Sequence, residues 1–268
     1  MIHLTNTERL TYVFDLDGVI YRGMEPQPHA NEVLAELKRR GHIVRFFTNN
    51  ATKTRLSYVC KLEKMGVPAT IDEIMTSSYA TALYFVEKKA VGKTVYRIGE
   101  KGMAEEFEAV GMHVIYDQDE PDAPIDFVTV GLDREFNYRK LVRAQHAILD
   151  GAQFIATNED ATFPIESGAL LPGAGAIVAS VRTATSVKPF VVGKPETYAY
   201  NKVLELVGCP AERSVMVGDR LDTDIVGGNR AGARSVLVLT GVTSREQAMH
   251  ANGEAKPDQI IETLEGLL

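Results

Sequence analysis

The sequence has few cysteines, no long apolar run and no excess of positive charge, and each absence excludes a class of protein. Its 268 residues include only Cys60 and Cys209, too few for a disulfide framework or a cysteine-ligated zinc site. We therefore expect two ordinary thiols in a reducing compartment.

The composition argues against membranes and nucleic acids as partners. No stretch approaches the roughly 18 consecutive apolar residues that a membrane-spanning helix needs. The first ten residues, MIHLTNTERL, lack the basic start and apolar run of a signal peptide. The formal net charge of −7 argues against a general nucleic-acid or anionic-membrane surface. We expect a cytoplasmic protein that binds neither.

What the sequence does contain is an alternation of short β-branched runs and longer helical segments. Apolar runs at 11–16 and 42–50 are each followed by a helical pattern, and the same alternation returns near 190–240. This alternation predicts an α/β fold with a doubly wound, Rossmann-like parallel sheet covered by helices.

The spacing of the chain predicts a second domain inside the first. Thr48 follows Asp17 by 31 positions, but Lys194 follows Thr48 by 146, far more than one crossover requires. We predict a core of residues 1–77 and 176–268 and an inserted α/β domain over 78–175. The glycine-rich LPGAGA at 171–176 is expected to be the return hinge.

Polar residues follow four of the predicted strands, and carboxylates are costly to bury without a partner. They are Asp15 with Asp17, Thr48 with Asn49, Lys194, and Asp219. Since ligands bind beyond the carboxyl ends of parallel strands, we expect these groups to share one edge.

The acids suit a metal site that performs covalent catalysis. Asp15 and Asp17 are two positions apart, which on an extended chain places both side chains on one side. Magnesium accepts carboxylate and carbonyl oxygens, and Asp219 would add a ligand. One aspartate can then attack phosphorus while the other moves a proton.

The remaining strand-end groups suit phosphate recognition. Thr48 and Asn49 are expected where a strand meets a helix, with a hydroxyl and backbone N–H groups facing an anion. Lys194 supplies a compact positive charge. Asp224, five residues after Asp219, is expected to steady the lysine or the metal-bound waters.

The motifs DLDGVIY, TNN, VGKP and GDRLDTDI, in this order and spacing, resemble the four motifs of haloacid dehalogenase-type phosphatases. The insert resembles the family's C2 cap, and VGLD, TNED and LPGAGA resemble the 4-nitrophenylphosphatase or NagD-like subfamily. The resemblance implies a magnesium-dependent phosphatase that hydrolyses small phosphate monoesters through an aspartyl-phosphate.

The resemblance implies a role for each residue that matches one of the family's motifs. Asp15 would be the nucleophile and Asp17 the general acid and then base. Thr48 and Asn49 would bind the phosphoryl group, and Lys194 would neutralise it. Magnesium would be held by Asp15, Asp219 and the backbone carbonyl of Asp17, with Asp224 in support.

The predicted cap should select the leaving group. The resemblance makes Leu132 and Phe163 substrate-facing, although core packing is an equal alternative for these apolar residues. Glu159 and Asp160 are interpreted as loop charges rather than catalytic acids. The family's caps often pair, which makes a homodimer through the cap possible.

Other functions fit part of the pattern. A phosphotransferase or mutase would use the same intermediate, but Asp17 favours hydrolysis because a base there can activate water. A catalytically silent phosphometabolite-binding module would be expected to lack Asp15 or Asp17. A receiver domain has acids at strand ends but no room for the insert.

Overall fold

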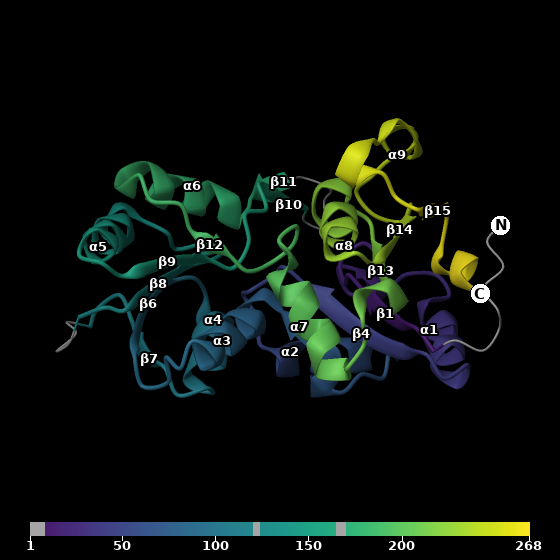
Figure 1. Cartoon of the computed structure of the whole chain (residues 1–268), viewed down its shortest axis with the longest axis horizontal. Coiled ribbons are helices and arrows are strands. Elements are labelled where there is room, and N and C mark those ends of the chain that lie inside the picture. The colour runs from purple at the N-terminus through teal and green to yellow at the C-terminus, as the bar shows by residue number, and fades with distance from the viewer. Residues whose placement is uncertain (1–8, 120–123, 165–169) are drawn as a thin grey trace. The chain divides into compact units, whose positions relative to one another are not determined.

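A computed structural model of the chain describes residues 9–119, 124–164 and 170–268. The chain forms two compact units, each built on its own parallel sheet (Figure 1). The first unit contains Met1–Phe47, Val59–Ile74 and Tyr200–Leu268. The second contains Thr48–Tyr58 and Met75–Ala199.

The sheet of the first unit has six strands, and their central residues are buried. In spatial order they are β15 (Gln259–Ile261), β14 (Arg234–Val238), β13 (Ser214–Gly218), β1 (Thr11–Phe14), β4 (Ile43–Thr48) and β5 (Ile74–Thr76). All four residues of β1 are buried, as expected for a parallel strand covered on both faces. Its register pairs Phe14 with Val217 on one side and with Phe46 on the other.

The strand order reverses between β1 and β13, and this reversal decides where a ligand can bind. From β1 the chain moves outward to β4 and β5, whereas from β13 it moves the other way to β14 and β15. Right-handed crossovers therefore place α1 (Ala30–Arg39) and α8 (Val226–Ala231) on opposite faces (Figure 1). This is the predicted doubly wound α/β fold, which is confirmed, and its crevice lies beyond β1 and β13.

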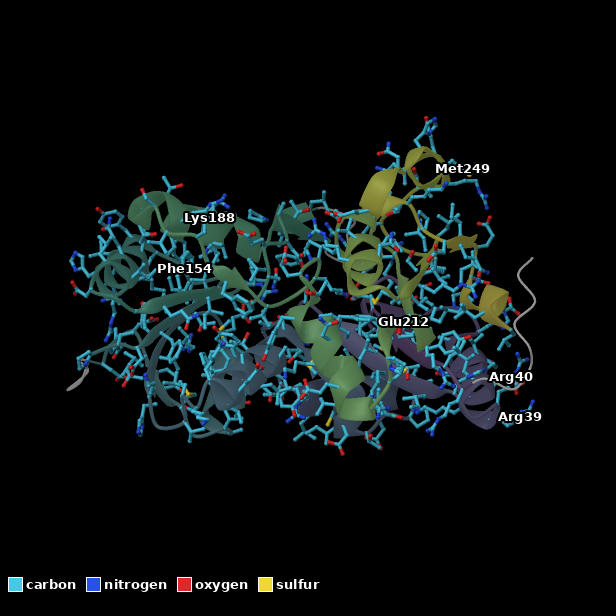
Figure 2. The ribbon with its side chains drawn as sticks, viewed as in Figure 1. Arg39, Arg40, Phe154, Lys188, Glu212 and Met249 are labelled. Carbon is cyan, nitrogen blue, oxygen red and sulfur yellow. The ribbon has the colours of Figure 1, made fainter. Side chains whose placement is uncertain are left out.

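Helix α1 shows how the sequence selects the buried side of a helix in the first unit. Ala30, Val33, Leu34 and Leu37 recur at helical spacing and are buried. At its solvent-exposed end, the carboxylate of Glu36 pairs with the Arg39 and Arg40 side chains labelled in Figure 2. The other helices counted with this unit, wholly or in part, are α2 (Arg55–Lys64), α7 (Thr197–Val207) and α9 (Arg245–His250).

The sheet of the second unit has five parallel strands. In spatial order they are β12 (Phe190–Val191), β9 (Gln153–Ala156), β8 (Phe127–Val130), β6 (Thr94–Ile98) and β7 (His113–Ile115). Helices α5 (Tyr138–Leu149) and α6 (Ala174–Thr185) cover one face, and α3 (Ser77–Glu87) and α4 (Lys101–Glu108) the other (Figure 1). Phe154, labelled in Figure 2, is buried in the core beneath α5 and α6.

Two short antiparallel hairpins complete the described strands. The hairpin of β2 (Tyr21–Arg22) and β3 (Glu25–Pro26) follows β1, and that of β10 (Thr162–Pro164) and β11 (Leu170–Pro172) precedes α6. None of the helices in the described ranges has the length and apolar character needed to cross a bilayer.

The second unit differs in extent from the predicted insert of 78–175. The predicted return hinge LPGAGA is wrong, because Leu170–Pro172 form β11 and α6 begins at Ala174. Ile177, Val178 and Val181 of α6 are buried against the five-stranded sheet, and β12 pairs with β9. These contacts keep the chain in the second unit until Ala199.

Candidate active site

Three carboxylates of the first unit meet beyond the carboxyl ends of β1 and β13. Asp15 follows β1, Asp219 follows β13, and Asp224 lies in the short π-helical turn Leu221–Ile225. Each offers a carboxylate oxygen, and these oxygens all lie within 4.8 Å of one another. Asp219 and Asp224 are 2% and 1% exposed, so water screens their charges poorly.

Backbone N–H groups fix the two buried carboxylates. One oxygen of Asp224 accepts hydrogen bonds from the backbone N–H groups of Asp219 and Arg220, both at 3.1 Å. The Asp219 carboxylate accepts a 2.7 Å bond from the N–H of Val242. Asp224 therefore holds the loop that carries Asp219. The sequence analysis expected it to steady the lysine or the metal-bound waters, which stays a prediction.

Glycines surround these carboxylates because a side chain would overlap with them. A Cβ on Gly241 would lie 1.9 Å from an Asp219 oxygen, and one on Gly218 would lie 2.1 Å from the Asp224 Cβ. Gly18 also approaches Asp219 and has a φ of +85°, which favours glycine for a second reason.

Asp17 stands apart from the three carboxylates, contrary to the expectation from an extended chain. Strand β1 ends at Phe14, and the chain then bends and forms a turn in which the Gly18 N–H donates to the Tyr21 carbonyl at 2.8 Å. Asp17 is exposed, yet neighbouring protein atoms desolvate its carboxyl and raise its pKa. Lys61 and Arg22 oppose that increase through their positive charges.

In the second unit, Asn49 acts as a hub between segments that are distant in sequence. Its carboxamide NH₂ donates to the Lys194 carbonyl at 2.9 Å and to the Asp160 carboxylate at 3.0 Å. Its carboxamide oxygen accepts from the Lys194 N–H at 2.9 Å. The backbone carbonyl of Asn49 accepts from Ser77 and Asn158. The side chain is thus committed to holding Lys194, which the sequence did not predict.

Two other expectations about this group are corrected by the structure. Helix α2 begins at Arg55, so Thr48, the last residue of β4, and Asn49, which follows it, do not stand at the start of a helix. The Thr48 hydroxyl instead accepts a hydrogen bond from the Asn50 N–H at 3.2 Å. Lys194, which is buried, follows β12 and hence the five-stranded sheet, so the four predicted strand ends do not belong to one sheet.

The predicted substrate-facing residues both lie in the second unit. Leu132 follows β8 and Phe163 is in β10, and each is half-buried. The guanidinium of Arg134 lies 5.4 Å from the centre of the Phe163 ring, within reach of a cation–π contact. Asp160, interpreted from sequence as a loop charge, lies outside the helices and strands and accepts the hydrogen bond from Asn49.

Comparison with known proteins identifies the family. A sequence model of haloacid dehalogenase-like hydrolases matches residues 12–113, and a second HAD-hydrolase-like model matches residues 191–267. An acid sugar phosphatase of Staphylococcus saprophyticus is 39% identical over 236 residues, covering 88% of each chain. The chain belongs to the haloacid dehalogenase-like hydrolases.

Solved structures of this hydrolase family agree with the fold of the chain. The p-nitrophenyl phosphatase of Archaeoglobus fulgidus is 33% identical, with a TM-score of 0.89 over 97% of this chain and 98% of that one. The glycerol phosphate phosphatase of Mycobacterium tuberculosis, solved in complex with magnesium, is 35% identical. Its TM-score is 0.87, and the match covers 99% of this chain and 78% of that one. This chain is a phosphoric monoester hydrolase of the same family.

The donor set of this hydrolase fits a hard divalent cation. The cluster offers carboxylate oxygens and no sulfur or imidazole nitrogen, which is the chemistry that magnesium prefers. Three carboxylates within 4.8 Å, two of them on buried residues, repel one another, and a cation bound among them would relieve that repulsion. The residues present therefore fit magnesium.

Proposed function

We propose that the chain is a magnesium-dependent phosphatase that hydrolyses small phosphate monoesters through an aspartyl-phosphate on Asp15. The observation that supports this most is the meeting of Asp15, Asp219 and Asp224 at the strand-order reversal of a doubly wound sheet. Bound magnesium, held by Asp15, Asp219 and the Asp17 carbonyl, would neutralise charge on the phosphoryl oxygens.

In the first half of the reaction, an Asp15 oxygen forms a bond to phosphorus and the bond from phosphorus to the ester oxygen breaks. Asp17 gives its proton to that oxygen as it leaves. The raised pKa of Asp17 supports this role because it keeps a larger fraction of the carboxyl protonated at a given pH.

In the second half, water attacks the phosphorus of the aspartyl-phosphate. Asp17, now a carboxylate, takes a proton from this water, the bond between phosphorus and the Asp15 oxygen breaks, and inorganic phosphate leaves. A base in this position favours hydrolysis over transfer to another acceptor.

Lys194, Thr48 and Asn49 would bind the phosphoryl group during both steps. The Lys194 ammonium would neutralise it, with the Asn49 carboxamide holding the lysine backbone in place. The Thr48 hydroxyl and the Asn49 backbone N–H would donate to it, since the Asn49 side chain is already engaged. The proposal requires these groups to meet the Asp15 cluster around one phosphoryl group.

The second unit would select the leaving group as a cap domain, with Leu132 and Phe163 facing it. Closure of such a cap would exclude bulk water and limit the enzyme to small substrates. A homodimer formed through this unit remains a prediction from the resemblance.

Phosphate release from a panel of phosphomonoesters, with magnesium or with a chelator, tests the proposal directly. Asp15→Asn should lower kcat by more than about a thousandfold, because the amide is a poor nucleophile. Asp222→Asn is the matched control, since Asp222 lies in the same turn with its side chain 70% exposed and outside the carboxylate cluster. Retained turnover in Asp15→Asn, or release that chelator leaves unchanged, would contradict the mechanism.

A further inference from the structure

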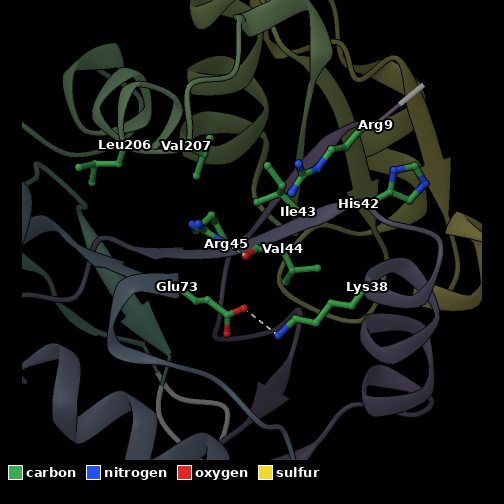
Figure 3. Close-up of a pocket in the computed structure, with 9 residues that line it drawn as sticks. All are labelled: Arg9, Lys38, His42, Ile43, Val44, Arg45, Glu73, Leu206 and Val207. Atoms are coloured by element: carbon green, nitrogen blue, oxygen red, sulfur yellow. Dashed lines mark hydrogen bonds and ion pairs between the residues drawn. The ribbon is translucent and has the colours of Figure 1, made fainter. Parts of the chain in front are cut away.

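A pocket of about 430 Å³ lies at the amino end of the six-stranded sheet, away from the edge that carries the carboxylates. Its lining residues come from the first unit: Arg9, Lys38, His42, Ile43, Val44, Arg45, Glu73, Leu206 and Val207 (Figure 3). Ile43 is the first residue of β4, whereas Thr48 is its last. The volume lies in the range of small-molecule sites.

Arg45 is the unusual member of this lining. It lies in the third position of β4, inside a parallel sheet whose strands are normally apolar on both faces. Among the described residues, its guanidinium pairs with no carboxylate and donates only to the Val44 carbonyl, at 2.8 Å. Burial lowers the Arg45 pKa, and Arg9 lowers it further, although Glu73 and Asp72 oppose this. The guanidinium is half-buried and lines the pocket, so its remaining N–H donors can reach a ligand there.

The acid in the pocket does not remove the excess of positive charge. Glu73 is bound by Lys38 at 2.8 Å, the contact drawn as a dashed line in Figure 3, and by the backbone N–H of Thr70 at 3.0 Å. Arg9 lies at the other side of the pocket in that view and pairs with no carboxylate in the described part of the chain. Arg9, Lys38 and Arg45 outweigh Glu73, so the lining carries a formal charge of +2 (three cations less one anion, His42 neutral) in a protein whose net charge is −7.

We propose that this pocket is a second, non-catalytic binding site for a small organic anion, a phosphate or carboxylate group carried on an apolar body. The guanidinium of Arg45, assisted by Arg9, binds the anionic oxygens, because its planar donors match both groups. The side chains of Ile43, Val44, Leu206 and Val207 contact the apolar part. The site is independent of the proposed hydrolysis, whose residues follow the opposite ends of the strands.

The experiment is an NMR titration of the isotope-labelled full chain in chelator and low salt. The probes are phenylphosphonate, which has no ester bond to hydrolyse, and benzoate, so that the two arms separate phosphate from carboxylate recognition. We expect at least one probe to saturate shifts of the amides of 42–45 and 206–207. Arg45→Met should weaken that binding by on the order of tenfold or more, the loss expected for a charge-assisted hydrogen bond.

Two variants control this titration. Arg139→Met makes the same change at an exposed arginine of α5 and should leave the dissociation constant unchanged. Lys194→Met should also leave it unchanged if the probe binds at the amino end of the sheet. Arg45→Met is expected to fold, because methionine suits a buried strand position, and its thermal midpoint reports this. Failure of both probes to shift residues 42–45 would overturn the site. So would shifts that persist in Arg45→Met, or that disappear in Lys194→Met.

Discussion

At the residue scale, the Asp17 carboxyl is a group whose charge is set by opposing influences. Desolvation raises its pKa, while Lys61, whose ammonium lies 3.5 Å from the centre of the Tyr21 ring, lowers it. Replacing Lys61 with methionine removes a cation that favours the carboxylate, so the Asp17 pKa should rise further. Because the proposed general acid must be protonated, the alkaline limb of kcat/KM should shift to higher pH in Lys61→Met.

The measurement is the pH profile of kcat/KM for wild type and Lys61→Met with one substrate. Lys64→Met is a suitable comparison, because it removes a lysine that also lies on α2 but does not contribute to the pKa shift of Asp17. A shift of the alkaline limb toward lower pH in Lys61→Met would contradict the role of Asp17 as acid.

At this scale, site residues could be predicted from the sequence where a polar residue follows an apolar run. Asp15 and Asp219 were identified because they follow strands, and Asp224 because it follows Asp219 by five residues; the structure brings the three together. The hub function of Asn49 was missed, because hydrogen bonds to Lys194 and Asp160 join segments more than 100 residues away. Nothing in the local sequence reports such partners.

At the scale of an element, α6 begins where two glycines let the chain pass close to a carbonyl. A Cβ on Gly175 would lie 2.4 Å from the backbone oxygen of Glu159. Glycine to alanine in a helix ordinarily stabilises by up to about 1 kcal/mol. Here we expect Gly175→Ala to destabilise by on the order of 1–3 kcal/mol, because the backbone must move. Thermal or urea unfolding of the variant and the wild type measures the sign of this change in the free energy of unfolding.

The neighbouring residue provides the control for that prediction. Ala176 is exposed, so Ala176→Gly should cost only the helix propensity of about 1 kcal/mol. A gain of stability in Gly175→Ala would show that the approach to Glu159 is not close in solution. The sequence predicted a hinge here because Gly-rich segments usually mark loops, whereas these glycines are required by packing.

At the scale of the whole molecule, metal removal should lower stability. A ligand that binds only the folded state at 100 times its dissociation constant adds about 2.7 kcal/mol. Magnesium should therefore raise the thermal midpoint of the wild-type chain. Asp219→Asn should reduce this shift, while Asp222→Asn should preserve it. An equal magnesium shift in Asp219→Asn would argue against the carboxylate cluster as the metal site.

The division of the molecule was harder to predict than its fold class. The alternation of strands and helices was sufficient to predict a doubly wound α/β sheet. The boundaries were not predictable in the same way, because β12 has only two residues and its pairing with β9 depends on tertiary packing. The short apolar run that begins at residue 190 would fit a strand in either of the two parallel sheets, so the sequence alone does not assign it to one of them.

The segment Thr48–Tyr58 has a consequence for how such proteins can be recombined. It is counted with the second unit although residues 59–74 separate it from the remainder of that unit. A Cβ on Gly102 would lie 2.5 Å from the Lys53 Cα, and the Arg55 guanidinium lies 3.4 Å from the centre of the Tyr79 ring. A chimera that exchanges only residues 75–199 with a relative would therefore pack the new residues against residues 48–58 of the original chain, to which they are not matched. Grafts that also carry residues 48–58 preserve this packing.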